Sequence, residues 1–501
     1  FNGVNYGQTL NVPKFDDVFA STILSDNNKI LPIQGITTTS ETSTSSNSNL
    51  KFNIFAMAPS GPAQQYDKNV TFPLGQEGEF YCDQPTDNDY RIIPKSHISG
   101  DFNGDGLTDV LTIEKQYYRK ECIPQQEDPY SQYTYCDCSL IPVNNGNSKV
   151  YFIDLKATAA TTAINAGTLS VSIRTGLDKL YGIDFNGDGK TDLMHIRDGF
   201  VRVYSLSSNN TLVQIASHFN SAIDEDKPIL LGDYNGDGKA DFASPAANNS
   251  STWNFFVSRG DNIYQYSANI GVYYQENYRP GGNAFVNGVY MNDPLYEYHY
   301  IPQDFNGDGK TDILKHEIVS PWQSITLVSD HIQLYTNRQT TSSQPSFALT
   351  VNSVATNNGL SKYGAPLFVE SNQSANLEYA YIVANDIFTY EFSNDHRIDT
   401  SLKGISNNGL TTDVQYERLN SQYGSTVYQH DSNEDYPYVN INIAPTFKVV
   451  KEVTRSGAGY SQKQMFLYKG AVSHVTGLGF LGFKEVKRSN WHGTGVGRLW
   501  N

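Results

Sequence analysis

Four short segments carry the residues of this chain that could do chemistry. They are DFNGDGLTD at 101–109, DFNGDGKTD at 184–192, DYNGDGKAD at 233–241 and DFNGDGKTD at 304–312. All four follow the pattern D-x-N-G-D-G-x-x-D, which places carboxylate or amide oxygens at positions 1, 3, 5 and 9. Ca²⁺ takes about six to eight oxygen ligands, and carboxylates this close repel one another without a cation. The pattern therefore predicts four calcium loops and about four Ca²⁺ ions per chain.

The predicted ligands are the residues at positions 1, 3, 5, 7 and 9 of each loop, where position 7 lends its backbone carbonyl. They are Asp101, Asn103, Asp105, Leu107 and Asp109; Asp184, Asn186, Asp188, Lys190 and Asp192; Asp233, Asn235, Asp237, Lys239 and Asp241; and Asp304, Asn306, Asp308, Lys310 and Asp312. Glycines at positions 4 and 6 permit the sharp bends that let these oxygens converge. A metal-free turn rich in Asp, Asn and Gly is the alternative, which the fourfold repetition disfavours.

The flanking residues indicate which elements must position the loops. An EF-hand needs a bidentate Glu at its twelfth position and a helix on each side. The twelfth positions here are Thr112, His195, Ser244 and Lys315. The flanks are strand-like, as in VLTIEK at 110–115, and they lack helical periodicity. We therefore predict that the loops join strands.

The strands around the loops predict a repeated antiparallel unit. DLMHIRDGFVRVYSL (192–206) indicates a strand, an Asp-Gly turn and a strand, and SITLVSDHIQLYTN (324–337) repeats this with a Ser-Asp turn. The shortest separation between loop starts, 49 residues from 184 to 233, suits one four-stranded propeller blade. Longer separations indicate insertions such as 114–148, and 365–372 resembles a metal-free unit. The predicted fold is all-β, with a calcium-loop β-propeller of five to seven blades.

These loops and their strands resemble FG-GAP/VCBS-type repeats, which occur in integrin-like β-propellers and in secreted bacterial proteins. Residues beyond 397 resemble the stretch after the propeller in toxin-complex (Tc) B components and other Rhs-type proteins. The residues that carry this second resemblance are NNGLTTDVQYERL (407–419), Pro437-Tyr438 ahead of FKVVKEV (447–453), and Tyr468 followed by GLGFLGF (477–483). The chain departs from the family because it lacks the repeated Tyr-Asp motifs of the Rhs shell and a C-terminal toxin domain.

Three regions are expected along the chain. Residues 1–49 would contain N-terminal strands and a Ser/Thr-rich linker, TTTSETSTSSNSN at 37–49. Residues 50–395 would form the propeller, and 396–501 a β-rich segment resembling the start of a Tc/Rhs shell. The chain begins FNGVNYG, without Met or a signal-like stretch. We interpret it as a processed or trimmed chain, and as the front part of a larger protein.

Composition excludes several classes of protein. The 501 residues include 36 basic and 52 acidic side chains, for a formal charge of −16. Such an acidic chain is poorly suited to bind nucleic acid or an anionic membrane. The sequence contains no run of about 18 apolar residues, so it predicts no membrane-spanning helix. Charged residues make up only 18%, so the chain is not of the highly charged, disordered kind.

Four cysteines lie in the first third of the chain: Cys82, Cys122, Cys136 and Cys138. Cys136 and Cys138 would share one face of a strand and could take different partners. Disulfides to Cys82 and Cys122 are the preferred interpretation, which implies an oxidising, extracellular compartment. A four-Cys zinc site, weakened by the lack of a C-x-x-C pair, and four free thiols remain open.

No catalytic constellation stands out in the sequence. H-E-x-x-H and G-x-S-x-G are absent, and His195 and His316 are interpreted as strand residues. GLGFLG at 477–482 satisfies G-x-G-x-x-G, but strand-like residues follow it instead of a helix. The acidic run 224–226 is interpreted as a surface turn. We predict that the chain is not an enzyme and that any catalytic domain lies outside it.

The resemblance implies a secreted, non-enzymatic scaffold that docks a partner, either the remainder of a larger Tc/Rhs chain or a separate component. Its propeller would close one end of a hollow shell. An alternative is a cell-surface adhesin or lectin whose Tyr-rich stretches 271–283 and 288–300 bind a glycan or a protein receptor; an insertion packed on the rim is the simpler explanation of both stretches. A third possibility is the regulatory half of an enzyme.

Overall fold

A computed structural model shows how the strands of this chain are arranged. It describes residues 16–24, 32–58, 61–78, 88–125, 135–142, 146–156, 162–274, 279, 281–286, 289–306, 308–321, 326–327, 329–339, 344–355, 360–361, 364–369, 378–383, 386–391, 402–420, 426–431, 438–441, 443–474, 479–493 and 498–501. All regular structure in these residues is β-strand. No helix in this part of the chain is long and apolar enough to cross a membrane.

Five four-stranded antiparallel sheets follow one another along the chain. Sheet 1 contains β1 (Asp17–Leu24), β2 (Pro32–Ser43), β3 (Asn47–Ala58) and β4 (Gly61–Pro73); sheet 2 contains β7 (Lys95–Gly100), β8 (Asp109–Glu114), β11 (Ser148–Asp154) and β12 (Ile164–Leu169); sheet 3 contains β13 (Lys179–Ile183), β14 (Asp192–Arg197), β15 (Phe200–Leu206) and β16 (Leu212–Phe219); sheet 4 contains β17 (Leu230–Gly232), β18 (Asp241–Pro245), β19 (Thr252–Ser258) and β20 (Ile263–Asn269); and sheet 5 contains β23 (Pro294–Gln303), β24 (Asp312–Pro321), β26 (Ser329–Asn337) and β27 (Phe347–Ala355). In each sheet the four strands pair in chain order.

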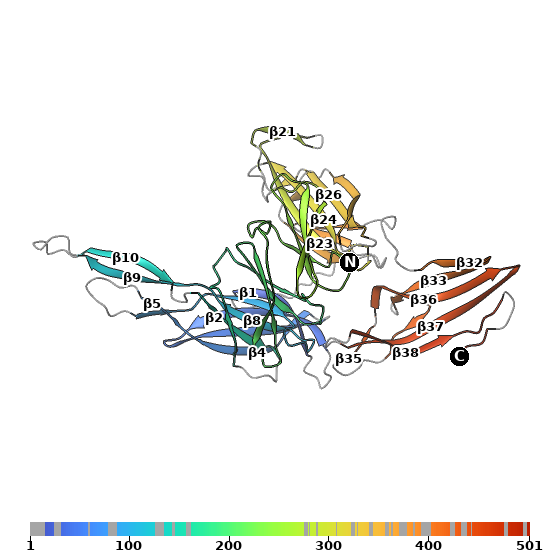
Figure 1. Ribbon diagram of the computed structural model, residues 1–501, viewed down its shortest axis with the longest axis horizontal. Coiled ribbons are helices and arrows are strands. Elements are labelled where there is room, and N and C mark those ends of the chain that lie inside the picture. The colour runs from blue at the N-terminus through green and yellow to red at the C-terminus, as the bar shows by residue number, and fades with distance from the viewer. Residues whose placement is uncertain are drawn as a thin grey trace, which may run out of the picture.

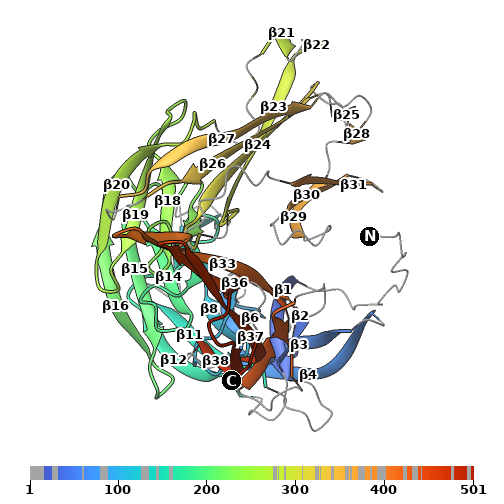
Figure 2. The same ribbon diagram turned by 90° about the vertical axis from the view of Figure 1, so that its right-hand side faces the viewer.

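Sheet 6 is three-stranded and contains β29 (Gly364–Val369), β30 (Glu378–Val383) and β31 (Asp386–Glu391). Sheets 1 to 6 follow one another around a common centre, as Figure 2 shows. This arrangement in the described residues confirms the predicted all-β, propeller-like fold, whereas the expected number of five to seven blades stays a prediction.

The remaining strands form small hairpins and a separate C-terminal sheet. The pairs are β5 (Gly75–Gly78) with β6 (Asn88–Arg91), β9 (Tyr118–Gln125) with β10 (Tyr135–Pro142), β21 (Asn283–Val286) with β22 (Val289–Asn292), and β25 (Thr326–Leu327) with β28 (Leu360–Ser361). The C-terminal sheet contains β32 (Gly404–Asn407), β33 (Leu410–Asn420), β34 (Tyr428–Gln429), β35 (Tyr438–Ile441), β36 (Ile443–Gly457), β37 (Tyr460–His474) and β38 (Gly479–Arg488). In Figure 1 this sheet and the β9/β10 hairpin lie at opposite ends of the molecule.

Apolar clusters between consecutive sheets form the core. In β8, Val110 packs with residues of sheet 1 and Leu111 with residues of sheet 3, because successive strand residues face opposite sides. Similar clusters join sheets 3 and 4, sheets 4 and 5, and sheets 5 and 6. An inner strand is thus buried on both faces, which explains why a run such as VLTI in 110–113 does not alternate between apolar and charged residues and is buried throughout.

Two local predictions, one in sheet 1 and one in sheet 5, were wrong. The tract 37–49, expected as a linker, lies mostly in β2 and β3, and Thr37 and Thr39 are fully buried. Its β-branched threonines suit a strand, and the Thr37 hydroxyl donates a 3.0 Å hydrogen bond to Ser21 Oγ of β1. The expected turn at Ser329-Asp330 is instead part of β26, because β24 extends to Pro321 and pairs with both residues.

The Asp-Gly turn predicted in 192–206 is confirmed, and a second two-residue turn of the same kind lies in the C-terminal sheet. Asp198 and Gly199 connect β14 to β15 with φ of 51° and 77°. Asn408 and Gly409 connect β32 to β33 with φ of 50° and 78°. Positive φ at both central residues is the two-residue geometry that fits the twist of a hairpin.

The disulfide prediction lies outside what the structure describes. Cys82 is not among the described residues, and the side chains of the other three cysteines are not described. The backbone register of β9 and β10 places Cys122 directly opposite Cys138.

Candidate metal centre

Each predicted calcium loop connects the first two strands of a four-stranded sheet. Loop 1 (101–109) joins β7 to β8, loop 2 (184–192) joins β13 to β14, loop 3 (233–241) joins β17 to β18, and loop 4 (304–312) joins β23 to β24. Strands on both sides confirm that these are not EF-hands. The loops occupy equivalent places in sheets 2 to 5.

The aspartate at position 1 organises its own loop. In loop 1, Asp101 Oδ1 accepts the backbone N–H groups of Gly104 at 2.8 Å and Asp105 at 2.9 Å, and Oδ2 accepts that of Gly106 at 2.7 Å. Gly104 and Gly106 have φ of +76° and +79°, which glycine adopts without strain. The same three bonds recur in loops 2 and 3. The backbone amides of each loop therefore point at one carboxylate.

Positions 3 and 5 add two further oxygens near the same bend. Asn103 Oδ1 accepts the Asp105 N–H at 2.9 Å, and Asp105 Oδ1 accepts the Leu107 N–H at 3.0 Å. The equivalent bonds occur in the other three loops. In three loops an ammonium group lies against the position 5 carboxylate: Lys156 pairs with Asp105, Lys239 with Asp237 at 3.3 Å, and Lys310 with Asp308 at 3.2 Å. These side chains already attract positive charge.

The aspartate at position 9 is buried in every loop. Asp109, Asp192 and Asp312 are 0% exposed and Asp241 is 1% exposed. Burial raises the pKa of Asp109, Asp241 and Asp312 to about 8, and that of Asp192 to about 6. Ionising these carboxyls is therefore unfavourable, and a nearby cation would offset that cost.

The donor set fits a hard cation in its chemistry. All predicted side-chain ligands are oxygens, and the buried Oδ1 atoms of Asp109 and Asp192 have no hydrogen-bond partner. Within the described residues, however, no three His, Cys, Asp or Glu side chains converge closely enough to hold a metal ion. Position 9 instead points one oxygen at the loop backbone, as Asp241 Oδ2 does toward the Tyr234 N–H at 2.9 Å. The predicted ligand set stays a prediction.

The two histidines that follow the loops are buried strand residues. His195 Nε2 lies 3.1 Å from Asp178 Oδ1, and His316 Nδ1 lies 2.8 Å from the Tyr379 hydroxyl. Both have partners away from the loop carboxylates.

Asp178, the partner of His195, predicts an acid-sensitive step in stability. Burial alone raises the pKa of this carboxyl, but hydrogen bonds from His195 and from the Arg174 N–H outweigh burial and leave its pKa below 3.8. Its stabilisation is thus present above pH 3.8 and is lost as the pH falls through the lowered pKa. We expect Asp178→Asn to cost about 1–3 kcal/mol in urea unfolding at pH 7. The difference from wild type should shrink at pH 3; an equal difference at both pH values would contradict this account.

Two other segments singled out in the sequence, the acidic run 224–226 and the Tyr-rich stretch 271–283, have structural roles in the described residues. Asp224 and Lys227 form a 3.3 Å ion pair within a surface turn. From the Tyr-rich stretch 271–283, Tyr273 is only 4% exposed and packs edge-on against Trp253, with ring centroids 5.7 Å apart. The packing of Tyr273 thus favours, for this residue, the packed insertion over a binding surface.

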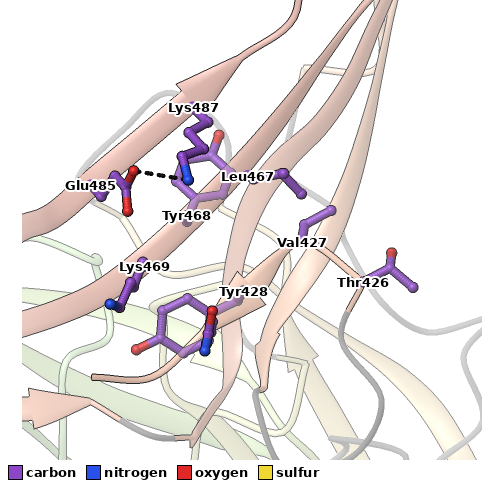
Figure 3. A pocket seen from close by; sticks show the side chains of 9 residues that line it. Thr426, Val427, Tyr428, Leu467, Tyr468, Lys469, Glu485 and Lys487 are labelled. Carbon is purple, nitrogen blue, oxygen red and sulfur yellow. Dashed lines mark ion pairs between the residues drawn. The ribbon is translucent and has the colours of Figure 1, made fainter. Parts of the chain in front are cut away.

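A hollow of about 350 Å³ lies in the C-terminal sheet and is shown in Figure 3. Its lining residues come from the segment that includes β34 and from β37 and β38: Thr426, Val427, Tyr428, Gln429, Leu467, Tyr468, Lys469, Glu485 and Lys487. Glu485 pairs with Lys487 at 3.0 Å, and Lys469 with Asp431 at 3.6 Å. Each of its three charged side chains therefore has a side chain of opposite charge beside it. Gly479 to Gly482 of the G-x-G-x-x-G run lie in β38, which confirms the strand interpretation.

Comparison with known proteins supports the repeat. The model of the FG-GAP-like repeat matches residues 184–244, which contain loops 2 and 3. A search of curated proteins finds no match. Among solved structures, the chain is similar to TcdB2-TccC3, with 11% identity over 94% of this chain and 23% of that chain and a TM-score of 0.28. It is also similar to an Agrocybe aegerita lectin that recognises non-reducing terminal N-acetylglucosamine, with 11% identity, coverage of 72% and 88%, and a TM-score of 0.30. The chain thus spans under a quarter of TcdB2-TccC3, and neither similarity is strong enough to indicate a function.

Proposed function

We propose that this chain is a secreted, non-enzymatic scaffold of the Tc/Rhs type, in which calcium-stabilised loops hold a propeller-like array that docks a protein partner. The observation that carries the proposal is the recurrence of one acidic loop at the same place in sheets 2 to 5. The FG-GAP-like match over residues 184–244 supports a repeat built around these loops.

The scaffold role follows from what each loop does. Position 1 gathers the amides of the bend, and position 9 begins the second strand, so each loop fixes the geometry between two strands. Bound Ca²⁺ would supply the positive charge that three carboxylates in nine residues lack. Four ions would add eight positive charges and change the formal charge from −16 to −8.

The docking role is supported by the C-terminal sheet. Phe447 and Phe480 are 39% and 41% exposed, and their ring centroids lie 4.9 Å apart. Leu481 and Val486 of the same sheet are 49% and 51% exposed. An exposed pair of aromatic rings in contact, such as Phe447 and Phe480, is the kind of apolar feature that interaction surfaces carry. From the resemblance of this region to Tc B and Rhs proteins, we expect the partner to be further shell or a docking component.

Native mass spectrometry of the full chain tests the calcium part of the proposal. In millimolar Ca²⁺ the protein should carry about four ions, and fewer in a variant with Asp105→Asn and Asp188→Asn. A chain that binds no Ca²⁺ under these conditions would overturn the proposal. For the docking part, we expect the Phe480→Ser variant to fold normally but to lose capture of the protein partner. Specific binding on a glycan array would instead favour the adhesin.

A further inference from the structure

The loops of consecutive sheets are joined by the residue at position 8, which is not among the predicted cation ligands. The Thr191 N–H of loop 2 donates to the Asp101 carbonyl of loop 1 at 2.7 Å, and the Asp101 N–H donates to Thr191 Oγ1 at 3.0 Å. Thr311 of loop 4 makes the same two bonds to Asp233 of loop 3, at 2.7 and 2.9 Å. We call this pair of bonds the threonine clamp.

The clamp also connects loop 1 to sheet 1. The Thr108 N–H donates to the Thr22 carbonyl at 3.0 Å, and the Thr22 N–H donates to Thr108 Oγ1 at 2.8 Å. Loop 3 carries Ala240 at position 8, so it keeps only the backbone bond to the Asp184 carbonyl, at 2.8 Å. Hydrogen bonds through position 8 therefore run without a break from β1 to loop 4.

The side chains at these junctions are complementary in size. A Cβ placed on Gly100 would lie 2.5 Å from Thr191 Cγ2, and one on Gly232 would lie 2.6 Å from Thr311 Cγ2. At the junction with the small Ala240, the residue before the loop aspartate is the large Ile183, and both belong to one apolar cluster. A threonine at position 8 thus lies against a glycine that precedes the neighbouring loop, whereas the alanine at position 8 is found where that preceding residue is isoleucine.

A second contact also joins each of these loops to the loop before it. The position 7 lysine lies across the position 4 glycine of the preceding loop: a Cβ on Gly104 would lie 2.9 Å from Lys190 Cγ, and one on Gly236 would lie 3.0 Å from Lys310 Cγ. Consecutive loops therefore touch at two points.

From these contacts we infer that position 8 is a positioning residue that couples the closure of each loop to that of the loop before it. The backbone of Asp101 is held by Thr191, while the Asp101 carboxylate gathers the amides of loop 1. Closing loop 2 therefore places the group that closes loop 1, and this coupling is reciprocal. Its cation-binding consequence rests on the proposed function: the loops bind Ca²⁺ as a coupled row, not as four independent sites.

Hydrogen–deuterium exchange of the full chain tests the coupling. Thr191→Val removes the hydroxyl acceptor and nearly keeps the shape, whereas Thr191→Ser keeps the acceptor. In EDTA, Thr191→Val should speed exchange of the loop 1 amides Gly104 to Gly106 about fivefold, which corresponds to roughly one hydrogen bond. Loops 3 and 4 should be unchanged, Thr191→Ser should stay close to wild type, and the exposed Thr168→Val is the control substitution.

A Ca²⁺ titration of the same exchange separates the coupling from the proposed function. Thr191→Val should raise the Ca²⁺ midpoint of loop 1 protection about fivefold, although it removes no predicted ligand. If Ca²⁺ protects no loop in any variant while Thr191→Val still loosens loop 1 in EDTA, the calcium proposal fails and the coupling stands. If loop 1 exchange is the same in wild type and Thr191→Val, the coupling is overturned.

Two substitutions with complementary changes in size provide a second test, in case Thr191→Val perturbs the fold. Gly100→Ala should speed loop 1 exchange, because its methyl group meets Thr191. Thr191→Ala in that background should reverse much of the increase in loop 1 exchange, as expected from the natural Ile183 and Ala240 pair. Purely additive effects of the two substitutions would overturn the complementarity.

Discussion

Excess EDTA is expected to lower the melting temperature of this chain by at least about 10 °C relative to millimolar Ca²⁺. An ion present at about 100 times its dissociation constant stabilises the native state by roughly 2.7 kcal/mol per site. Four such sites would contribute about 10 kcal/mol, and in domains of 150–250 residues each kcal/mol moves the melting temperature by about 2–4 °C. Because all four loops have a buried position 9 aspartate, we expect chelation to be the largest single perturbation of stability.

Differential scanning calorimetry measures this shift. Returning Ca²⁺ should restore the melting temperature, whereas the same ionic strength of NaCl should not, because screening cannot replace a ligated ion. Mg²⁺ should restore less, since it demands a near-ideal octahedral shell at short distances and gives up its waters reluctantly. Identical melting curves in EDTA and in Ca²⁺ would contradict calcium stabilisation.

The features that the sequence predicted correctly depend on neighbouring residues. Nine consecutive residues determine the bend of each loop, since Gly104 and Gly106 must adopt positive φ. The predicted Asp198-Gly199 turn is equally local. A short pattern therefore sufficed to predict strands, turns and loops of this kind.

The features that the sequence did not predict depend on distant partners. Burial of Thr37 costs little because its hydroxyl bonds to Ser21 of another strand, which a Ser/Thr-rich composition does not show. The threonine clamp joins Asp101 to Thr191, 90 positions away. Its only trace in the sequence is the pairing of position 8 with the residue before the preceding loop, glycine with threonine and isoleucine with alanine. That trace has meaning only once the order of the sheets is known.

The second large effect is expected at position 9 of loop 3. Asp241 is 1% exposed, and its two oxygens accept the Tyr234 N–H at 2.9 Å and the Ser258 N–H at 2.7 Å. Asp241→Ala would leave both buried donors unpaired, at about 1–3 kcal/mol each. We expect urea unfolding to show a loss of roughly 2–6 kcal/mol, and a smaller loss for Asp241→Asn, which retains one acceptor oxygen.

Asp237→Ala in the same loop is the matched control. The Asp237 side chain is 35% exposed and pairs with Lys239, so without a cation its removal should cost little. Because the bonds of Asp241 join protein groups, its loss should persist in EDTA, whereas the cost of Asp237→Ala should be seen mainly in Ca²⁺. If chelation abolished both losses, position 9 would act only through the cation; if it changed neither, position 5 would have no role in binding calcium.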